Sequence, residues 1–135
     1  MSRKSARESA FKIIFEIPFH EDSSVTDIME GYFKNEEDLM LTDGDMDYIS
    51  LCVNGCFDNA IEIDQKISAS LKNWTIERIS KVNLAILRLS VSEMQYADVP
   101  YQVSINESVE LAKKYSDDEA PSFVNGVLAD IKKLR

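Results

Sequence analysis

The chain has 135 residues, of which 44% are hydrophobic and only four are Gly and three Pro, so it fits one globular domain and favours helices over a turn-rich β fold. No apolar run approaches the roughly 20 residues that span a bilayer, and the basic N-terminus lacks the apolar stretch of a signal peptide. We therefore expect a cytoplasmic protein. The formal net charge of −9 argues against indiscriminate nucleic-acid binding, because phosphates repel an acidic surface.

Basic residues gather at one end of this acidic chain. Within residues 1–12 one acid, Glu8, stands against four cations: Arg3, Lys4, Arg7 and Lys12. The stretch 16–47 is strongly acidic. Two interpretations stay open: a solvated tail, as charge runs usually are, or a small anion site that clamps a phosphate, with Phe11 or Phe15 nearby to stack on bases.

The first two helices are predicted at residues 5–17 and 24–33. Ser5 and Glu8 have the spacing of a capping box, and Pro18 ends or bends the first helix. Gly31 weakens the second.

The third helical pattern begins at a capping residue, Thr42 or Asp43, and runs to Ile67 with apolar residues every three or four positions. A break is expected between residues 55 and 59. The acidic first turn suggests a calcium loop, but the required glycine and glutamate are replaced by Tyr48 and Asn54.

No metal or catalytic site is expected. Cys52 and Cys56 lie four positions apart in the third helical pattern, and His20 is the single histidine, so a four-ligand zinc site is close to excluded. We predict that both thiols are reduced and lie in or near the core. No serine–acid constellation accompanies His20.

Residues 79–94 form the central helix of the prediction. Its apolar residues occupy two nearly opposite faces: Ile79, Val82, Ile86 and Leu89 on one, and Leu84, Leu87, Val91 and Met94 on the other. Such a helix must be covered on both faces. Glu93 falls within an apolar arc and must be paired, in a structural ion pair rather than as a catalytic acid. Trp74, ahead of this helix, is predicted to cover one end of the core.

Two more helices are predicted after the break at residues 98–100. Ser104 and Glu107 have the spacing of a second capping box, and Pro121 suits the first turn of the last helix. Gly126, inside that helix, indicates close packing of another helix or the approach of a ligand.

Three stretches together resemble the NusB family of bacterial transcription antitermination factors. They are the central run 79–94 with Trp74 ahead of it, VPYQVSINESVELAKKY at 99–115, and PSFVNGVL at 121–128. The resemblance covers the whole chain, 1–135. It implies an all-α single domain of about seven helices, in which two small helical bundles share the long central helix.

The resemblance also implies a function without catalysis and without cofactors. Family members bind the boxA element of ribosomal RNA leaders together with NusE, a ribosomal protein, and the RNA polymerase antitermination complex then reads through terminators. An acidic body suits a basic partner such as NusE, and the basic N-terminus suits phosphates.

By position, the resemblance assigns an RNA-binding set and one partner contact. The RNA-binding set is Arg3, Lys4, Arg7, Phe15, Phe123 and Asn125. Relatives often have tyrosine at Phe15, so stacking is retained here and one hydrogen bond is lost. The NusE contact falls on Asn83, where acids are usual, so one charged contact to NusE is missing.

Two alternatives remain. One is a NusB-like module derived from an RNA methyltransferase, although no Gly-rich cofactor loop is present. The other is a helical protein–protein adaptor that does not use RNA. The sequence leaves monomer or homodimer open.

Overall fold

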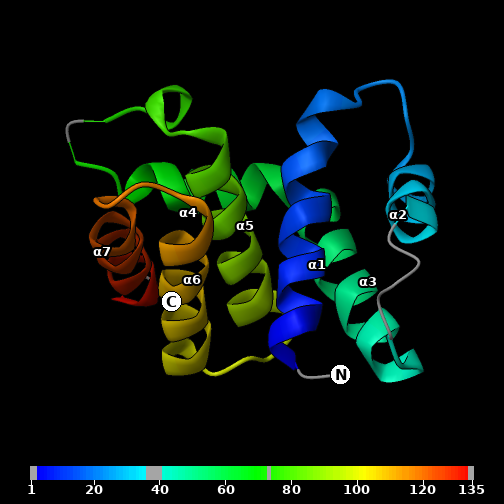
Figure 1. Cartoon of the computed structure of the whole chain (residues 1–135). Coiled ribbons are helices and arrows are strands. Elements are labelled where there is room, and N and C mark those ends of the chain that lie inside the picture. The colour runs from blue at the N-terminus through cyan, green and yellow to red at the C-terminus, as the bar shows by residue number, and fades with distance from the viewer. Residues whose placement is uncertain (1–2, 36–40, 73, 134–135) are drawn as a thin grey trace.

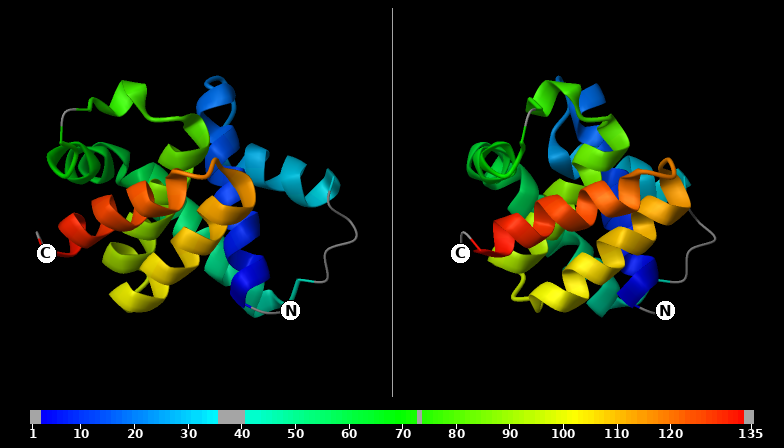
Figure 2. Two further views of the ribbon diagram at one scale, coloured as in Figure 1. Left: turned by 60° about the vertical axis from the view of Figure 1, so that its left-hand side comes forward. Right: turned by 90° about the vertical axis from the view of Figure 1, so that its left-hand side faces the viewer.

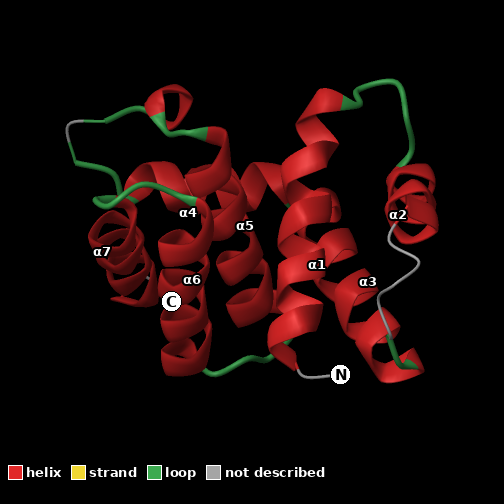
Figure 3. Cartoon of the chain, in the orientation of Figure 1, coloured by secondary structure: helices red, strands yellow, loops and turns green. Residues whose placement is uncertain are grey.

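The computed structural model describes residues 3–35, 41–72 and 74–133, and all regular structure in these ranges is helical (Figure 1 and Figure 3). Two short 3-10 helices are η1 (Ile17–Phe19) and η2 (Ile76–Arg78). The α-helices are α1 (Arg3–Glu16), α2 (Val25–Asn35), α3 (Asp43–Asp58), α4 (Ala60–Ala69), α5 (Lys81–Tyr96), α6 (Tyr101–Tyr115) and α7 (Ala120–Lys133). The predicted all-α class is confirmed. No helix in the described ranges is long and apolar enough to cross a membrane.

Helix α5 is the shared centre of the fold. In Figure 1 it lies between α1 and α3 on one side and α6 and α7 on the other. Both predicted apolar faces are covered, and only Val82 stays partly exposed. The helix begins after Ser80, whose Oγ accepts the backbone N–H of Asn83 at 3.1 Å. Ile79 is buried but precedes the helix.

Two bundles meet on α5. The first contains α1, α2 and α3, and the second contains α4, α6 and α7. In both views of Figure 2, α7 crosses the front of the molecule and α6 lies beside it. Buried residues from both bundles belong to one contiguous hydrophobic cluster, so the two halves share a core through α5.

The predicted start and break of the third helical pattern are confirmed. Thr42 Oγ1 accepts the backbone N–H of Asp45 at 3.1 Å, and Asp45 Oδ2 accepts that of Thr42 at 3.0 Å. The pattern breaks at Asn59, between α3 and α4. Cys52 and Cys56 are buried in the core, as predicted.

Both serine capping boxes predicted at Ser5 and Ser104 are wrong. Helix α1 already includes Arg3, so Ser5 lies inside it, and α6 begins at Tyr101 behind Pro100. Ser104 is buried, and its Oγ lies 2.7 Å from Ser90 Oγ. Its hydroxyl belongs to a buried polar network, which local spacing does not reveal.

Two further predictions are wrong. Trp74 does not cover the core, because 54% of it is exposed. A Cβ added to Gly126 would meet nothing within 4 Å, so the predicted close packing of another helix is wrong there, and the alternative, the approach of a ligand, stays a prediction. The close approach occurs instead at Gly55, where an added Cβ would lie 2.8 Å from Ser92 Oγ on α5.

Candidate nucleic-acid interface

Arg7, one of the predicted RNA-binding cations, lies in the core. It is only 6% exposed, and its Nε donates to Glu93 Oε2 at 2.6 Å. The Glu93 carboxylate also accepts the hydroxyls of Ser104, at 3.1 Å, and Tyr48. Burial alone would lower the pKa of Arg7, but the Glu93 carboxylate raises it above the ordinary value. The predicted ion pair of Glu93 is therefore confirmed.

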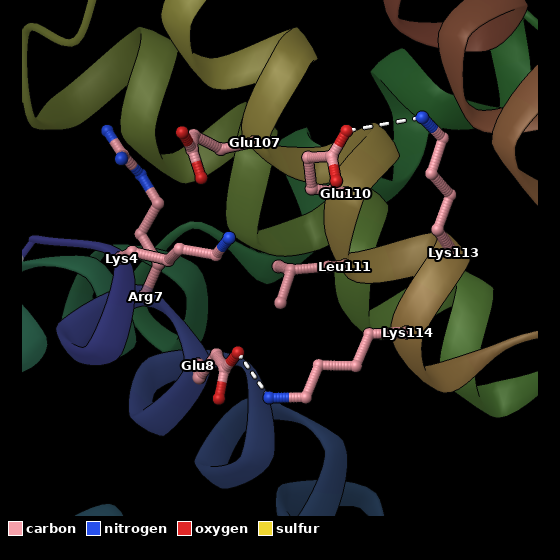
Figure 4. Close-up of a pocket in the computed structure, with 8 residues that line it drawn as sticks. All are labelled: Lys4, Arg7, Glu8, Glu107, Glu110, Leu111, Lys113 and Lys114. Carbon is pink, nitrogen blue, oxygen red and sulfur yellow. Dashed lines mark hydrogen bonds and ion pairs between the residues drawn. The ribbon is translucent and has the colours of Figure 1, made fainter.

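A hollow of mixed charge lies where α1 meets α6 (Figure 4). It is lined by Lys4, Arg7 and Glu8 of α1 and by Glu107, Glu110, Leu111, Lys113 and Lys114 of α6. Lys4 is exposed, and Figure 4 shows its ammonium pointing into the hollow. Among the described residues Lys4 makes no ion pair, so its charge is free to meet an anion.

Among the described residues, the charges of this hollow other than Lys4 and Glu107 are in ion pairs. Lys114 Nζ donates to Glu8 Oε1 at 2.8 Å, and the Tyr115 hydroxyl donates to Glu8 Oε2 at 3.1 Å. Burial opposes the charge of Glu8, but these two hydrogen bonds lower the pKa of its carboxyl. Glu8 therefore ties the start of α1 to the end of α6.

Aromatic rings of α1 and α6 lie close to one another and to two lysines. Phe15 is partly buried and lines a second hollow with Phe11, Lys12, Glu16, Tyr32, Asn35, Val82 and Tyr115. The Phe11 ring centroid lies 6.5 Å from that of Phe15 and 5.1 Å from that of Tyr115. Lys12 Nζ and Lys114 Nζ lie 5.9 and 5.3 Å from the Tyr115 ring centroid. These contacts add Tyr115 and Lys12 to the candidate surface.

Tyr115 was not among the residues that the sequence analysis assigned to RNA binding. The signal was present in the run Lys113-Lys114-Tyr115 at the end of α6. The assignment of Tyr115 to this surface also depends on Lys12. Lys12 lies about a hundred positions earlier in the chain and contacts the Tyr115 ring only in the folded molecule.

Phe123 lines a third hollow, at the start of α7. Its other lining residues are Trp74, Arg78, Ile79, Ser80, Asn83, Asp117, Glu119 and Ala120. Asn83 Oδ1 accepts the Ser116 hydroxyl at 2.7 Å. The predicted partner contact and one predicted RNA-binding ring thus lie in the same hollow.

The three hollows are lined by residues that are neighbours along the chain. Lys114 lines the first, and its neighbour Tyr115 lines the second. Val82 lines the second, and its neighbour Asn83 lines the third. Lys4 and Arg7 thus line the first hollow, Phe15 lines the second, and Asn83 and Phe123 line the third. We refer to these three hollows together as the seam.

The remaining two predicted residues are not part of this series. Asn125 is exposed on α7 but lines none of the three hollows. The side chain of Arg3 lies outside the described residues. In the described part of the chain, no cluster of histidine, cysteine and acidic residues suits a metal ion.

Comparison with known proteins gives consistent matches. The model of the NusB family matches residues 4–133. A transcription antitermination protein NusB from Listeria monocytogenes is 45% identical over 135 residues, covering 97% of this chain and 96% of the relative. One from Clostridium botulinum is 41% identical over 139 residues, covering 95% and 97%.

Solved structures agree with these relatives. The structure of T. maritima NusB has a TM-score of 0.89 at 30% identity and covers 98% of this chain and 92% of that one. A crystal structure of antitermination factors NusB and NusE in complex with double-stranded RNA has a TM-score of 0.86 at 28% identity, covering 98% and 97%.

Proposed function

This chain belongs to the NusB family, and on that premise we propose that it is a non-catalytic antitermination factor that binds RNA together with NusE. The observation that best supports the proposal is the set of three hollows that present a cation without an ion pair among the described residues, Lys4, and the rings of Phe15, Tyr115 and Phe123. The solved complex of NusB and NusE with RNA, similar over nearly the whole chain, supports both partners.

The RNA we propose is the single-stranded boxA element of ribosomal RNA leaders. Lys4 contacts a phosphate, and Lys12 adds a second positive charge beside the Tyr115 ring. Phe15 and Phe123 stack on bases, which is how single-stranded RNA is usually recognised. A chain with a net charge of −9 binds RNA only where such groups overcome the repulsion, so binding is confined to this seam.

Arg3, Arg7 and Asn125 complete the proposed RNA-binding set, and they contribute in different ways. Arg7 lines the first hollow beside Lys4, but its Nε is held by Glu93. Arg7 therefore holds the first turns of α1 against α5. A phosphate contact at the first hollow is its second proposed contribution. Arg3, in the same first turn, and Asn125, beyond Phe123, extend the set at its two ends.

NusE is proposed to contact the acidic body next to Asn83. Only 9% of Asn83 is exposed and its Oδ1 accepts the Ser116 hydroxyl, so the proposed contact with NusE reaches Asn83 through the hollow that it lines. We propose that the RNA–NusE assembly works in the cytoplasm as part of the RNA polymerase antitermination complex.

Electrophoretic mobility of boxA RNA, measured with this protein, with NusE and with both, tests the proposal. We expect a weak shift with the protein alone and a stronger one with the pair, because each partner supplies part of the surface. A shift in none of these mixtures would support the adaptor alternative and contradict RNA binding.

The role of Lys4 is tested by measuring how the affinity of this protein and NusE together for boxA RNA depends on salt concentration. Lys4→Ala is expected to weaken binding and to reduce the slope of log K against log salt by about 0.7, the value for one phosphate contact to a single strand. Lys133→Ala is the matched control, because Lys133 ends α7, on the opposite side from the start of α1 (Figure 2). An unchanged slope for Lys4→Ala would remove Lys4 from the site.

A further inference from the structure

Trp74 is an exposed aromatic ring for which the fold has no evident use. It precedes η2 in the link between α4 and α5, and 54% of it is exposed although it is the only tryptophan of the chain. A ring that stabilised the core would be covered, since burial of the indole is its main stabilising contribution. Its exposure therefore points to a surface role.

Arg78 lies against the Trp74 ring. Its guanidinium carbon lies 5.3 Å from the Trp74 ring centroid, the distance of a cation–π contact. Arg78 is exposed and makes no ion pair among the described residues. The pair thus offers an accessible aromatic surface with an unneutralised positive charge beside it.

The hollow next to this pair suits a flat, uncharged ring better than a phosphate. Its aromatic members, Trp74 and Phe123, come from different parts of the chain. Asp117 and Glu119 line it too, and Asp117 Oδ1 accepts the backbone N–H groups of Glu119 and Ala120 at 3.1 and 3.0 Å. These carboxylates repel a phosphate inside the hollow, whereas an unpaired base can stack on a ring and leave its phosphate at the rim.

We propose that Trp74, positioned by Arg78, stacks on an unpaired RNA base next to the base bound by Phe123, so that the RNA path continues from the α6–α7 turn onto the α4–α5 link. This inference rests on the proposed RNA-binding function and deepens it. Arg78 meets the phosphate of the stacked nucleotide, the combination of ring and cation that single-stranded RNA sites use.

Intrinsic fluorescence tests the stacking directly, because Trp74 is the only tryptophan of the chain. A boxA RNA oligonucleotide is titrated into the protein, alone and with NusE, and the Trp74→Phe variant under identical conditions supplies the optical blank. Base stacking is expected to quench the indole emission in proportion to the RNA bound.

Affinity measurements with labelled boxA RNA give the second readout. Trp74→Ala is expected to lower the affinity of the pair about 5- to 150-fold, the effect of losing one stacked base, without changing the salt slope. Trp74→Phe keeps a ring and most of the affinity. Phe57→Ala is the matched control, since Phe57 is 52% exposed at the end of α3 and lines none of the seam hollows.

The outcomes separate this inference from the proposed function. If the parent chain binds boxA RNA but Trp74→Ala binds equally well and no quenching occurs, the Trp74 site is overturned and the function stands. If the parent chain binds no RNA with or without NusE, both fall. If Trp74→Ala weakens NusE binding in the absence of RNA, and RNA alone causes no quenching, Trp74 belongs to the protein interface and the base site is overturned.

Discussion

At the scale of single residues, the pairing of Arg7 with Glu93 gives a cation near the N-terminus a structural role in the core. Arg7 and Glu93 are 6% and 1% exposed, so each charge depends on the other and on the hydroxyls of Ser104 and Tyr48. Removing one partner leaves the other charge buried without its counter-charge, which is costly.

Arg7→Ala is therefore expected to lower the free energy of unfolding by roughly 3–5 kcal/mol, measured by urea denaturation. Lys113→Ala is the control, because the Lys113–Glu110 pair is exposed and contributes at most about 1 kcal/mol. A loss below about 1 kcal/mol for Arg7→Ala would show that the pair does not hold α1 against α5. RNA-binding defects of Arg7 variants have to be compared at matched stability.

At the scale of elements, one glycine sets how closely α3 approaches α5. An alanine Cβ at position 55 would lie 2.8 Å from Ser92 Oγ, which donates to the Cys52 carbonyl at 2.8 Å. Gly126 on α7 has open space at the same atom. Gly55 and Gly126 therefore differ in packing although both lie within a helix.

Gly55→Ala is expected to destabilise the protein by roughly 1–3 kcal/mol, because either the Ser92 hydroxyl must move and give up its hydrogen bond to the Cys52 carbonyl or the helices must separate. Gly126→Ala is expected to stabilise it by about 0.4–1 kcal/mol, because the unfolded chain loses freedom and the folded helix has room. Thermal or urea unfolding of both variants measures the difference. Equal effects would contradict the close approach of α3 and α5.

The contact between α1 and α6 has a predictable pH dependence. The Lys114 and Tyr115 hydrogen bonds hold the pKa of Glu8 below its ordinary value of 4.5, so the ionised carboxylate stabilises the folded state at neutral pH. This contribution is present above pH 4.5 and is lost as pH falls through the lower folded-state pKa.

Glu8→Gln should therefore be less stable than the parent at pH 7. The difference should shrink as the pH falls well below 4.5. Urea denaturation of parent and variant over this range measures it, and a difference that grows on acidification would contradict the Glu8–Lys114 contact.

At the scale of the whole molecule, the shared helix predicts that the two bundles unfold together. Their buried residues form one cluster, and Leu87 on α5 is fully buried within it. We propose that residues 1–135 form one domain, because neither bundle can expose α5 without losing part of its own core.

Native-state hydrogen exchange tests this cooperation. The slowest amides of α3 and α7 should exchange with the same opening free energy, and Leu87→Ala should lower both by about 2–5 kcal/mol. Ile61→Ala, at a position that is 76% exposed, is the control and should change neither. Separate values for α3 and α7 would indicate two independently unfolding units.

Much of the fold could be predicted from the sequence because its signals are local. The two apolar faces of residues 79–94 required a covered central helix, and Thr42 and Pro121 marked helix starts correctly. The serines at 5 and 104 have the same capping spacing, but here that spacing misled, because a serine hydroxyl also serves a buried network.

By itself, the sequence determined the helical class, the central helix, the family and the need for a partner of Glu93. Only the tertiary structure decided that this partner is Arg7, that Lys12 meets Tyr115, and that Trp74 is exposed beside Phe123. The physical reason is range: periodicity and capping act within a few residues, whereas Arg7 and Glu93 are 86 positions apart. Such pairs exist only after the helices pack.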